Sequence, residues 1–308
     1  MILRCRLLLL IFFLLSSFAP TISQATEGQT AKSKLRVVTT IRPLHSLLSN
    51  LMQGVATPVL LLDSSQSVHH YSLRPSQRST LSHSDILFWV GENLESFMPR
   101  VLNAIPKKVQ VVELLNTKGL KLLEPRSNTQ HHHSSFDPHI WLSIDNAISI
   151  ARKMSASLIR FDPEHQLLYQ SNLLQLTNKL LEQKKSISAK FIKPEFNYLV
   201  YHDALQYFEE QINIAPIATI STDEEQTPGI RHISKINKII KNNTINCLIY
   251  NTPTLPAIAR NLIDNKKILT VHIDPLGQNL KADPDLYFNL LDSITNGYVQ
   301  CQAQSEKH

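Results

Sequence analysis

Short runs of β-branched and aliphatic residues alternate along this chain with segments whose apolar residues recur every three or four positions. The runs are typical of buried strands, and the wider spacing puts apolar residues on one side of a helix. Leu44, Leu47 and Leu51, for example, predict a helix that begins at Pro43. Strands are predicted over residues 35–40, 59–62, 86–90, 109–112, 198–201, 215–220, 247–250 and 268–273. This alternation indicates an α/β protein in which helices cover parallel sheets.

The predicted strands form two blocks, and one long helical segment lies between them. Asp162 and Pro163 are a typical helix start, because aspartate caps the first turn and proline fits into it. Neither glycine nor proline interrupts residues 164–192, and about 25 helical residues would span some 37 Å. We therefore expect two lobes joined by one long, rigid helix. Its apolar stripe is expected to consist of Leu167, Leu168, Leu174, Leu180, Leu181 and Ile187.

The first residues have the pattern of an export signal. Arg4 and Arg6 precede the apolar run 7–15, which is shorter than the about 20 residues that a membrane-spanning helix needs. Ser23 and Ala25 then supply the small residues that signal peptidase requires. We expect cleavage after Ala25 and a periplasmic protein, and a retained membrane anchor is the alternative. The expected organisation is a signal peptide (1–25), an N-terminal lobe (34–160), a connecting helix (161–192) and a C-terminal lobe (193–303).

Charge and cysteine content narrow the class of protein. The formal net charge of +6 falls to +4 without residues 1–25, and the basic residues are scattered, so no nucleic-acid partner is indicated. Cleavage leaves two cysteines, Cys247 and Cys301, an even number that favours a disulfide in an oxidising compartment. The bridge would close a loop of about 54 residues and add roughly 4 kcal/mol of stability. Two buried thiols are the alternative.

Three histidines at predicted loop edges are candidate metal ligands. His69 and His139 lie in loops of the first block, and His202 directly follows a strand of the second. Ligands of open parallel sheets bind beyond the carboxyl ends of the strands, and neutral imidazoles suit zinc. We therefore expect a metal site at the lobe interface, with Asp274, which follows the last strand, as the oxygen donor. Asp203 is interpreted as an orienting partner of a ligand histidine or, equally, as a helix cap.

Four segments carry a resemblance to a known family. They are residues 69–76 (His-His-Tyr-Ser-Leu-Arg-Pro-Ser), 139–143 (His-Ile-Trp-Leu-Ser), 202–208 (His-Asp-Ala-Leu-Gln-Tyr-Phe) and 274–277 (Asp-Pro-Leu-Gly). In this order they resemble the ZnuA-like zinc-binding components of bacterial ABC importers, over essentially the whole mature chain. The resemblance implies two α/β lobes joined by a rigid helix, and a receptor that carries Zn²⁺ as cargo to a membrane permease. It also implies that His69, His139 and His202 are the metal ligands and that Cys247 pairs with Cys301.

The identity of the metal and of its fourth ligand depends on where this chain departs from the family. Manganese-type relatives usually carry a carboxylate at the place of His202, and a nitrogen there favours zinc. Some zinc-specific relatives have an acidic residue where Val68 stands, so the fourth donor here is Asp274, a water or His70. The histidine-rich loop of the zinc branch is reduced to His131, His132 and His133. These three predict a weak second metal site, and a solvated loop is an equal alternative.

Other functions fit the residues less well. A receptor for manganese or another divalent metal has the same fold, and an exported zinc hydrolase also needs three histidines and an open position. A hydrolase, however, needs a general base. The sequence has no His-Glu-x-x-His pair, and no glutamate near the three histidines presents itself as a general base. A surface adhesin would predict a lipid or wall anchor, and none is visible. We therefore expect a monomeric zinc receptor that is not an enzyme.

Overall fold

The computed structural model describes residues 35–63, 68–69, 71–126, 136–192, 195–221 and 228–306. Residues from Leu35 onward belong to one compact unit. The expected signal peptide, His70 and the histidines at 131–133 lie outside the described residues. Within the described ranges, no helix is both long enough and apolar enough to cross a membrane.

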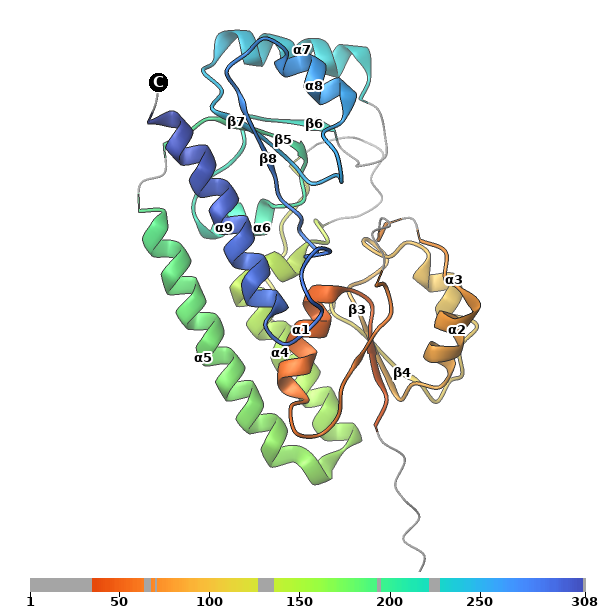
Figure 1. Ribbon diagram of the computed structural model, residues 1–308. Coiled ribbons are helices and arrows are strands. Elements are labelled where there is room, and N and C mark those ends of the chain that lie inside the picture. The colour runs from red at the N-terminus through yellow and green to blue at the C-terminus, as the bar shows by residue number, and fades with distance from the viewer. Residues whose placement is uncertain are drawn as a thin grey trace, which may run out of the picture. The chain divides into compact units, whose positions relative to one another are not determined.

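The first sheet contains four parallel strands and lies in the first half of the chain (Figure 1). Its order is β2 (Val59–Leu60), β1 (Val37–Thr39), β3 (Ile86–Trp89) and β4 (Gln110–Glu113). Every residue of β1 and β3 is buried, as expected for central strands that helices cover on both faces. The helices that connect these strands are α1 (Arg42–Leu51), α2 (Pro75–Ser82) and α3 (Met98–Leu102).

The second sheet repeats this arrangement with four parallel strands from the second half of the chain. Its order is β6 (Ala218–Ser221), β5 (Tyr198–His202), β7 (Cys247–Tyr250) and β8 (Leu269–His272). The connecting helices are α6 (Gln206–Gln211), α7 (Ile230–Asn242) and α8 (Ala257–Ile263). The two predicted blocks of strands are therefore both present, and each forms one parallel sheet.

The two faces of the second sheet belong to different apolar clusters. Leu199 and Leu248 pack in a small cluster with residues of α7 and α8. Tyr198 and Val200, which point to the opposite face because side chains alternate along a strand, join the main cluster of the protein. The main cluster also contains the buried residues of the first sheet. One hydrophobic core therefore extends from one sheet to the other.

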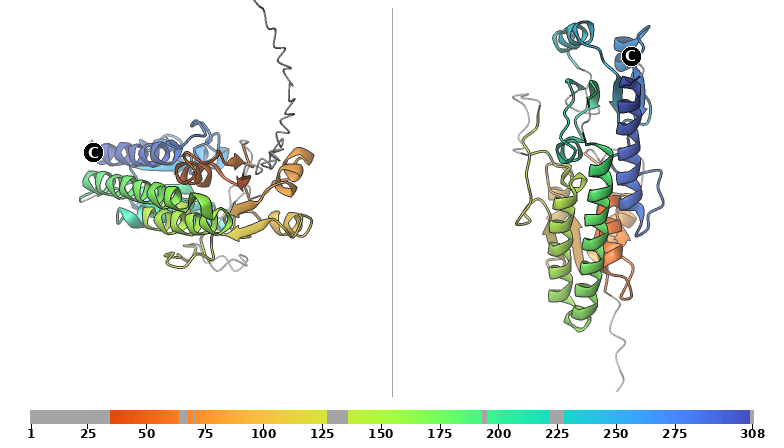
Figure 2. Two further views of the ribbon diagram at one scale, coloured as in Figure 1. Left: turned by 90° about the horizontal axis from the view of Figure 1, so that it is seen from below. Right: turned by 90° about the vertical axis from the view of Figure 1, so that its left-hand side faces the viewer.

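Long helices from both halves of the chain pack side by side (Figure 2). They are α4 (Ile144–Phe161), α5 (Gln166–Lys190) and α9 (Leu286–Ser305), and a 3-10 turn, Pro163–His165, precedes α5. Helix α1 contacts all three of these helices. Because α9 from the end of the chain packs on α1 from its beginning, the lobe boundaries at 34–160, 161–192 and 193–303 stay a prediction.

The predicted long helix is present, but its apolar stripe is only partly correct. Leu180 and Ile187 are buried, whereas Leu167 is 80% exposed and Leu174 is 63% exposed. The buried face is completed by Tyr169, Asn172 and Leu176. A spacing of seven residues aligns Leu167, Leu174 and Leu181 along one side of the helix, opposite this buried face. The helix thus has two apolar stripes, and only one faces the core.

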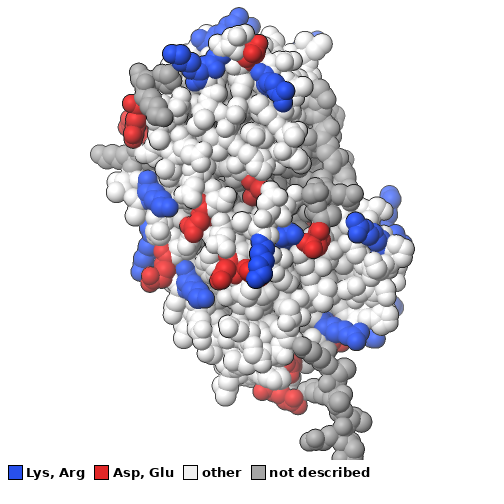
Figure 3. Space-filling view, in the orientation of Figure 1, with Lys and Arg blue, Asp and Glu red and all other residues white. Residues whose placement is uncertain are grey.

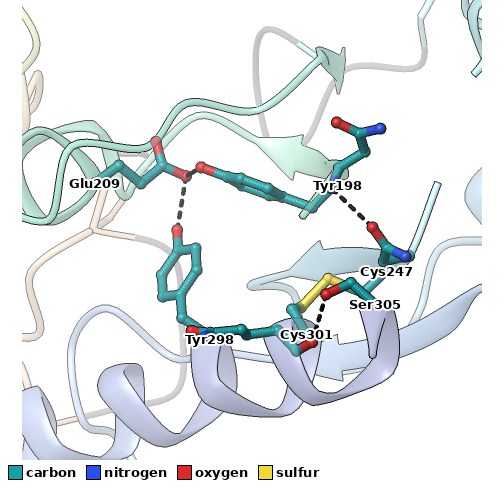
Figure 4. The surroundings of a disulfide bond; sticks show 9 residues. Tyr198, Glu209, Cys247, Tyr298, Cys301 and Ser305 are labelled. Carbon is teal, nitrogen blue, oxygen red and sulfur yellow. Dashed lines mark hydrogen bonds between the residues drawn. A yellow bond between two sulfur atoms is a disulfide. The ribbon is translucent and has the colours of Figure 1, made fainter. Parts of the chain in front are cut away.

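The predicted disulfide is present between Cys247 at the start of β7 and Cys301 near the end of α9, with a Cα–Cα distance of 5.5 Å (Figure 4). It fastens the last helix to the second sheet. On the face shown in Figure 3, basic and acidic side chains are interspersed over much of the surface.

Candidate metal centre

His69, His139 and His202 come together from three separate elements. One ring nitrogen of each lies within 4.8 Å of the corresponding nitrogens of the other two. The ring centroids are 5.8 Å apart for His69 and His139, 6.2 Å for His69 and His202, and 5.9 Å for His139 and His202. A tetrahedral ion bound at about 2.1 Å needs nitrogens about 3.4 Å apart. The three side chains would therefore need to move together by no more than about 1.4 Å.

Each histidine lies at or beyond the carboxyl end of a strand, where parallel sheets bind their ligands. His202 is the last residue of β5, His69 lies in the loop before α2, and His139 directly precedes the 3-10 turn Ile140–Leu142. Carboxyl ends of parallel strands and the loops that follow them line the binding crevice of such folds. The structure thus brings together residues from both predicted lobes.

His69 is supported from the loop that follows β3. Its carbonyl oxygen accepts a hydrogen bond from Ser96 Oγ at 2.7 Å. The neighbouring Glu95 is fully buried, and its carboxylate accepts from the backbone N–H of Gly91 at 3.0 Å and from Thr40 Oγ1. Burial raises the pKa of Glu95 to about 7. The buried carboxylate therefore holds the turn that carries Ser96.

His139 is oriented by Asp137. One oxygen, Asp137 Oδ1, accepts from the backbone N–H of His139 at 2.9 Å and lies 2.7 Å from His139 Nδ1. When Nδ1–H donates to this carboxylate, the lone pair of Nε2 is left for a metal ion. The ring also lies 5.3 Å from the Trp141 ring. Sequence reasoning missed Asp137, although it lies only two residues before His139.

Asp203 does not have the predicted role of a helix cap. The N-cap of α6 is Leu205, and the carboxylate of Asp203 instead pairs with Arg126, with Oδ1 and Nη1 3.2 Å apart. Burial raises the pKa of Asp203 to about 7, although Arg126 opposes this shift. Asp137 contacts an imidazole of the cluster directly, and the orienting role of Asp203 toward a ligand histidine stays a prediction.

Arg126 also pairs with Glu209, a fully buried carboxylate on α6. Glu209 Oε1 accepts from Tyr198 at 2.9 Å and from Tyr298 at 2.6 Å (Figure 4). The network thus joins the segment before His139 to the strand that ends in His202. Nothing in the sequence distinguishes Glu209 from a surface glutamate.

We expect Arg126→Met to destabilise the metal-free protein by about 3 kcal/mol. Removing one partner of a buried ion pair leaves an uncompensated buried charge and typically costs about 3–5 kcal/mol. The lower end is expected here because the Arg126 side chain is 25% exposed. Urea unfolding at neutral pH measures the loss. The matched control is Lys121→Met, which breaks the exposed pair with Glu210 and should cost less than about 1 kcal/mol. Equal losses in the two variants would contradict the assignment.

Asp274 lies beside the cluster and not in it. Its Oδ1 accepts from the backbone N–H of Leu276 at 2.9 Å, and Oδ2 accepts from that of Gln278. Both oxygens therefore cap the turn after β8. Among the described residues, the group with ligand atoms in reach of one another contains histidines only. Asp274 does line the same cavity as His69 and His139.

Comparison with known proteins gives a family match over most of the chain. A family model described as "Zinc-uptake complex component A periplasmic" matches residues 37–301. The high-affinity zinc uptake system protein ZnuA of Brucella suis biovar 1 is 30% identical, and the match covers 87% of this chain and 92% of that protein. The protein of the same name from Yersinia pestis is 26% identical, and the match covers 86% of this chain and 90% of that protein.

Solved structures share the fold. A crystal structure of ZnuA has a TM-score of 0.75 at 18% identity and covers 87% of this chain and 99% of its own. The binding protein FpvC from Pseudomonas aeruginosa, in complex with Mn²⁺, has a TM-score of 0.76 at 17% identity, with 88% and 99% covered. Because one of these proteins was solved with manganese, the fold alone does not select the metal. The choice of ion must come from the side chains at the site.

Proposed function

Because the chain belongs to the family of periplasmic zinc-uptake components, the ZnuA family, we propose that it captures Zn²⁺ outside the cytoplasm and delivers it to the membrane permease of an ABC importer. The observation that carries this proposal is the convergence of His69, His139 and His202. Imidazole nitrogens favour zinc, whereas manganese prefers oxygen ligands. Zinc is the cargo here, and the protein performs no covalent chemistry on it.

Capture requires only that three neutral imidazoles replace water on the ion. His139 enters the site with Nδ1 held by Asp137, so its orientation is set before the ion arrives. We expect Asp274, a water or His70 to complete the coordination, with His131, His132 and His133 as a weaker second site. The mature protein, without residues 1–25, acts in the periplasm as a monomer and docks on the permease through the rims of both lobes.

Movement between the lobes should be small, because two kinds of connection join them. Helix α5 is a continuous stiff connector of 25 residues. The segment between β8 and α9 is also tied to α1: Arg42 donates to the carbonyl of Leu280 at 2.8 Å, and Ser46 and Asn50 both donate to that of Pro284 at 2.7 Å. Capture and release therefore depend on side chains and loops more than on domain closure.

A competitive titration of the mature, disulfide-bonded protein with Zn²⁺ and Mn²⁺ tests the proposal. Calorimetry with a chelator of known strength should give one tight zinc site that manganese does not displace. A weaker second phase would indicate the histidines at 131–133. Zinc affinity should fall below about pH 6.5, because protons then compete with the ion for the imidazoles. Tight manganese binding, or no tight site, would contradict the proposal.

Asp137→Asn should weaken zinc binding by about 10–100-fold, as loss of a carboxylate that orients a ligand histidine typically does. The variant removes the negative charge that favours the Nδ1–H form of His139. Chelator competition measures the affinity. The matched control is Asp145→Asn, which loses an exposed carboxylate paired with Lys184 and should bind zinc as the parent does. An unchanged affinity in the Asp137 variant would show that the contact does not act on the ion.

A further inference from the structure

The cavity lined by His69 and His139 is much larger than a metal ion needs. Its volume is about 570 Å³. A water molecule takes up about 30 Å³ in the liquid, so the space is equivalent to roughly twenty waters. An ion with a complete shell of six waters would use about a third of it. Pockets that hold small organic ligands begin at about 300 Å³.

The lining of this cavity suits a polar organic molecule. The cavity is lined by His69, His139 and Trp141, and by residues at or just after the ends of β7 and β8. The residues from the second sheet and its loops contribute amide, hydroxyl and imidazole groups, from Asn251, Thr252, His272, Gln278 and Asn279. Amide and hydroxyl groups can hydrogen-bond to a carboxylate, a hydroxyl or an amine. A few such groups in a concave site are typical of small-molecule recognition.

The charges around the cavity indicate how such a molecule would be held. Of the described residues, no lysine or arginine lines the cavity. An anion without a metal ion would therefore find little electrostatic attraction there. Three neutral imidazoles bring no negative charge to a bound Zn²⁺, and the carboxylate of Asp137, which contacts His139, does not line the cavity. The carboxylate of Asp274 is engaged with two backbone N–H groups. Zinc in proteins usually has four ligands, and an anionic oxygen supplied from the cavity would provide both the fourth donor and the charge.

We propose that this cavity binds a small carboxylate chelator, of the class of amino acids or hydroxycarboxylic acids, together with the ion held by His69, His139 and His202. When the chelator is bound, its carboxylate takes the fourth position in place of Asp274, a water or His70, and the side chains of Gln278 and Asn279 bind its remaining polar groups. The receptor thus takes up zinc as a chelate as well as a free ion. This inference rests on the proposed zinc-binding function and adds a second ligand to it.

The zinc ion and the chelator must then each raise the affinity of the protein for the other. If the ion raises the affinity for the chelator by some factor, the chelator raises the affinity for the ion by the same factor. The absence of lysine and arginine from the described lining means that the ion supplies most of the attraction. The chelator should therefore bind to the zinc-loaded protein and not to the metal-free protein.

Ultrafiltration of the mature protein with radiolabelled citrate or L-histidine tests this. We expect one equivalent of probe to be retained with zinc-loaded protein, and none with metal-free protein or with the variant lacking all three histidines. In the cobalt-loaded protein, the probe should change the visible absorption bands, because a new ligand enters the coordination shell while cobalt stays with the protein. Gln278→Ala/Asn279→Ala should weaken retention at least tenfold. The matched control is Gln300→Ala, an amide that lines a different cavity, and it should retain the probe fully.

The outcomes separate this inference from the proposed function. Tight zinc binding without retention of either probe would overturn the chelator site and leave the zinc receptor intact. Retention that does not depend on metal, or that survives in the Gln278/Asn279 variant, would also overturn it. Absence of tight zinc binding in the parent protein, measured without any probe, would instead overturn the proposed function.

Discussion

Zinc binding should be lost, by on the order of a thousandfold or more, when His69, His139 and His202 are all replaced by alanine. Loss of a single group that merely orients a ligand typically weakens metal binding 10–100-fold. The triple variant loses every nitrogen of the cluster that the described residues bring together. Chelator competition on the mature protein measures the loss, and each single variant should show a large part of it.

The triple substitution should remove zinc binding and the stabilisation that bound zinc provides. Zinc at a concentration a thousand times its Kd should stabilise the parent by about 4.1 kcal/mol, and the triple variant should lose this increment. The matched control replaces three histidines outside the cluster, His83, His165 and His232, whose contacts are hydrogen bonds to Ser79, Asp162 and Thr219. Undiminished zinc stoichiometry and affinity in the site variant, or an equal loss in the control, would show that the cluster is not the binding site.

The fold could be predicted because its strands are buried on both faces. Residues 86–89 read as a continuous apolar run because helices cover both sides of β3, and such runs are visible without any structure. The orientation of α5 was harder to predict. Its buried face includes Tyr169 and Asn172, whose side chains are not aliphatic, while leucines at 167, 174 and 181 lie on the opposite side. Periodicity identifies a helix with two stripes but does not say which stripe packs.

The candidate site could be predicted only as far as residue type and loop position determine it. His69, His139 and His202 belong to loop edges and are recognisable there. Arg126 and Glu209 are not, because they lie 83 positions apart in the chain and an ion pair of this kind exists only after folding. Glu95 is buried, but a glutamate in a polar stretch reads as a surface residue. Asp274 as a metal ligand stays a prediction, since its two oxygens cap a turn in this structure.

Replacing Cys247 and Cys301 by alanine should destabilise the protein by about 4 kcal/mol. The two residues are 54 positions apart, and the chain-entropy model gives about this value for a loop of that length. The bridge lies near the end of α9, the last helix of the protein, and Tyr298 one turn earlier donates to the buried Glu209 (Figure 4). Urea unfolding of the oxidised parent and the variant measures the difference. Dithiothreitol should lower the stability of the parent by a similar amount and leave the variant unchanged, and an effect on the variant would contradict the assignment.

Zinc affinity should be nearly the same in the folded disulfide variant as in the parent. Cys247 is the first residue of β7, whereas His202 is the last residue of β5, its parallel neighbour. The disulfide and the histidine cluster therefore lie at opposite ends of the second sheet. One route does connect them, from Tyr298 through Glu209 and Arg126 to Asp203 beside His202. Zinc affinity that falls in the disulfide variant and falls equally in Tyr298→Phe would contradict this expectation. It would show that the network transmits changes at the disulfide to the histidine cluster, although the two lie at opposite ends of the sheet. If affinity is retained in both, the disulfide stabilises the lobe and the three histidines act independently of it.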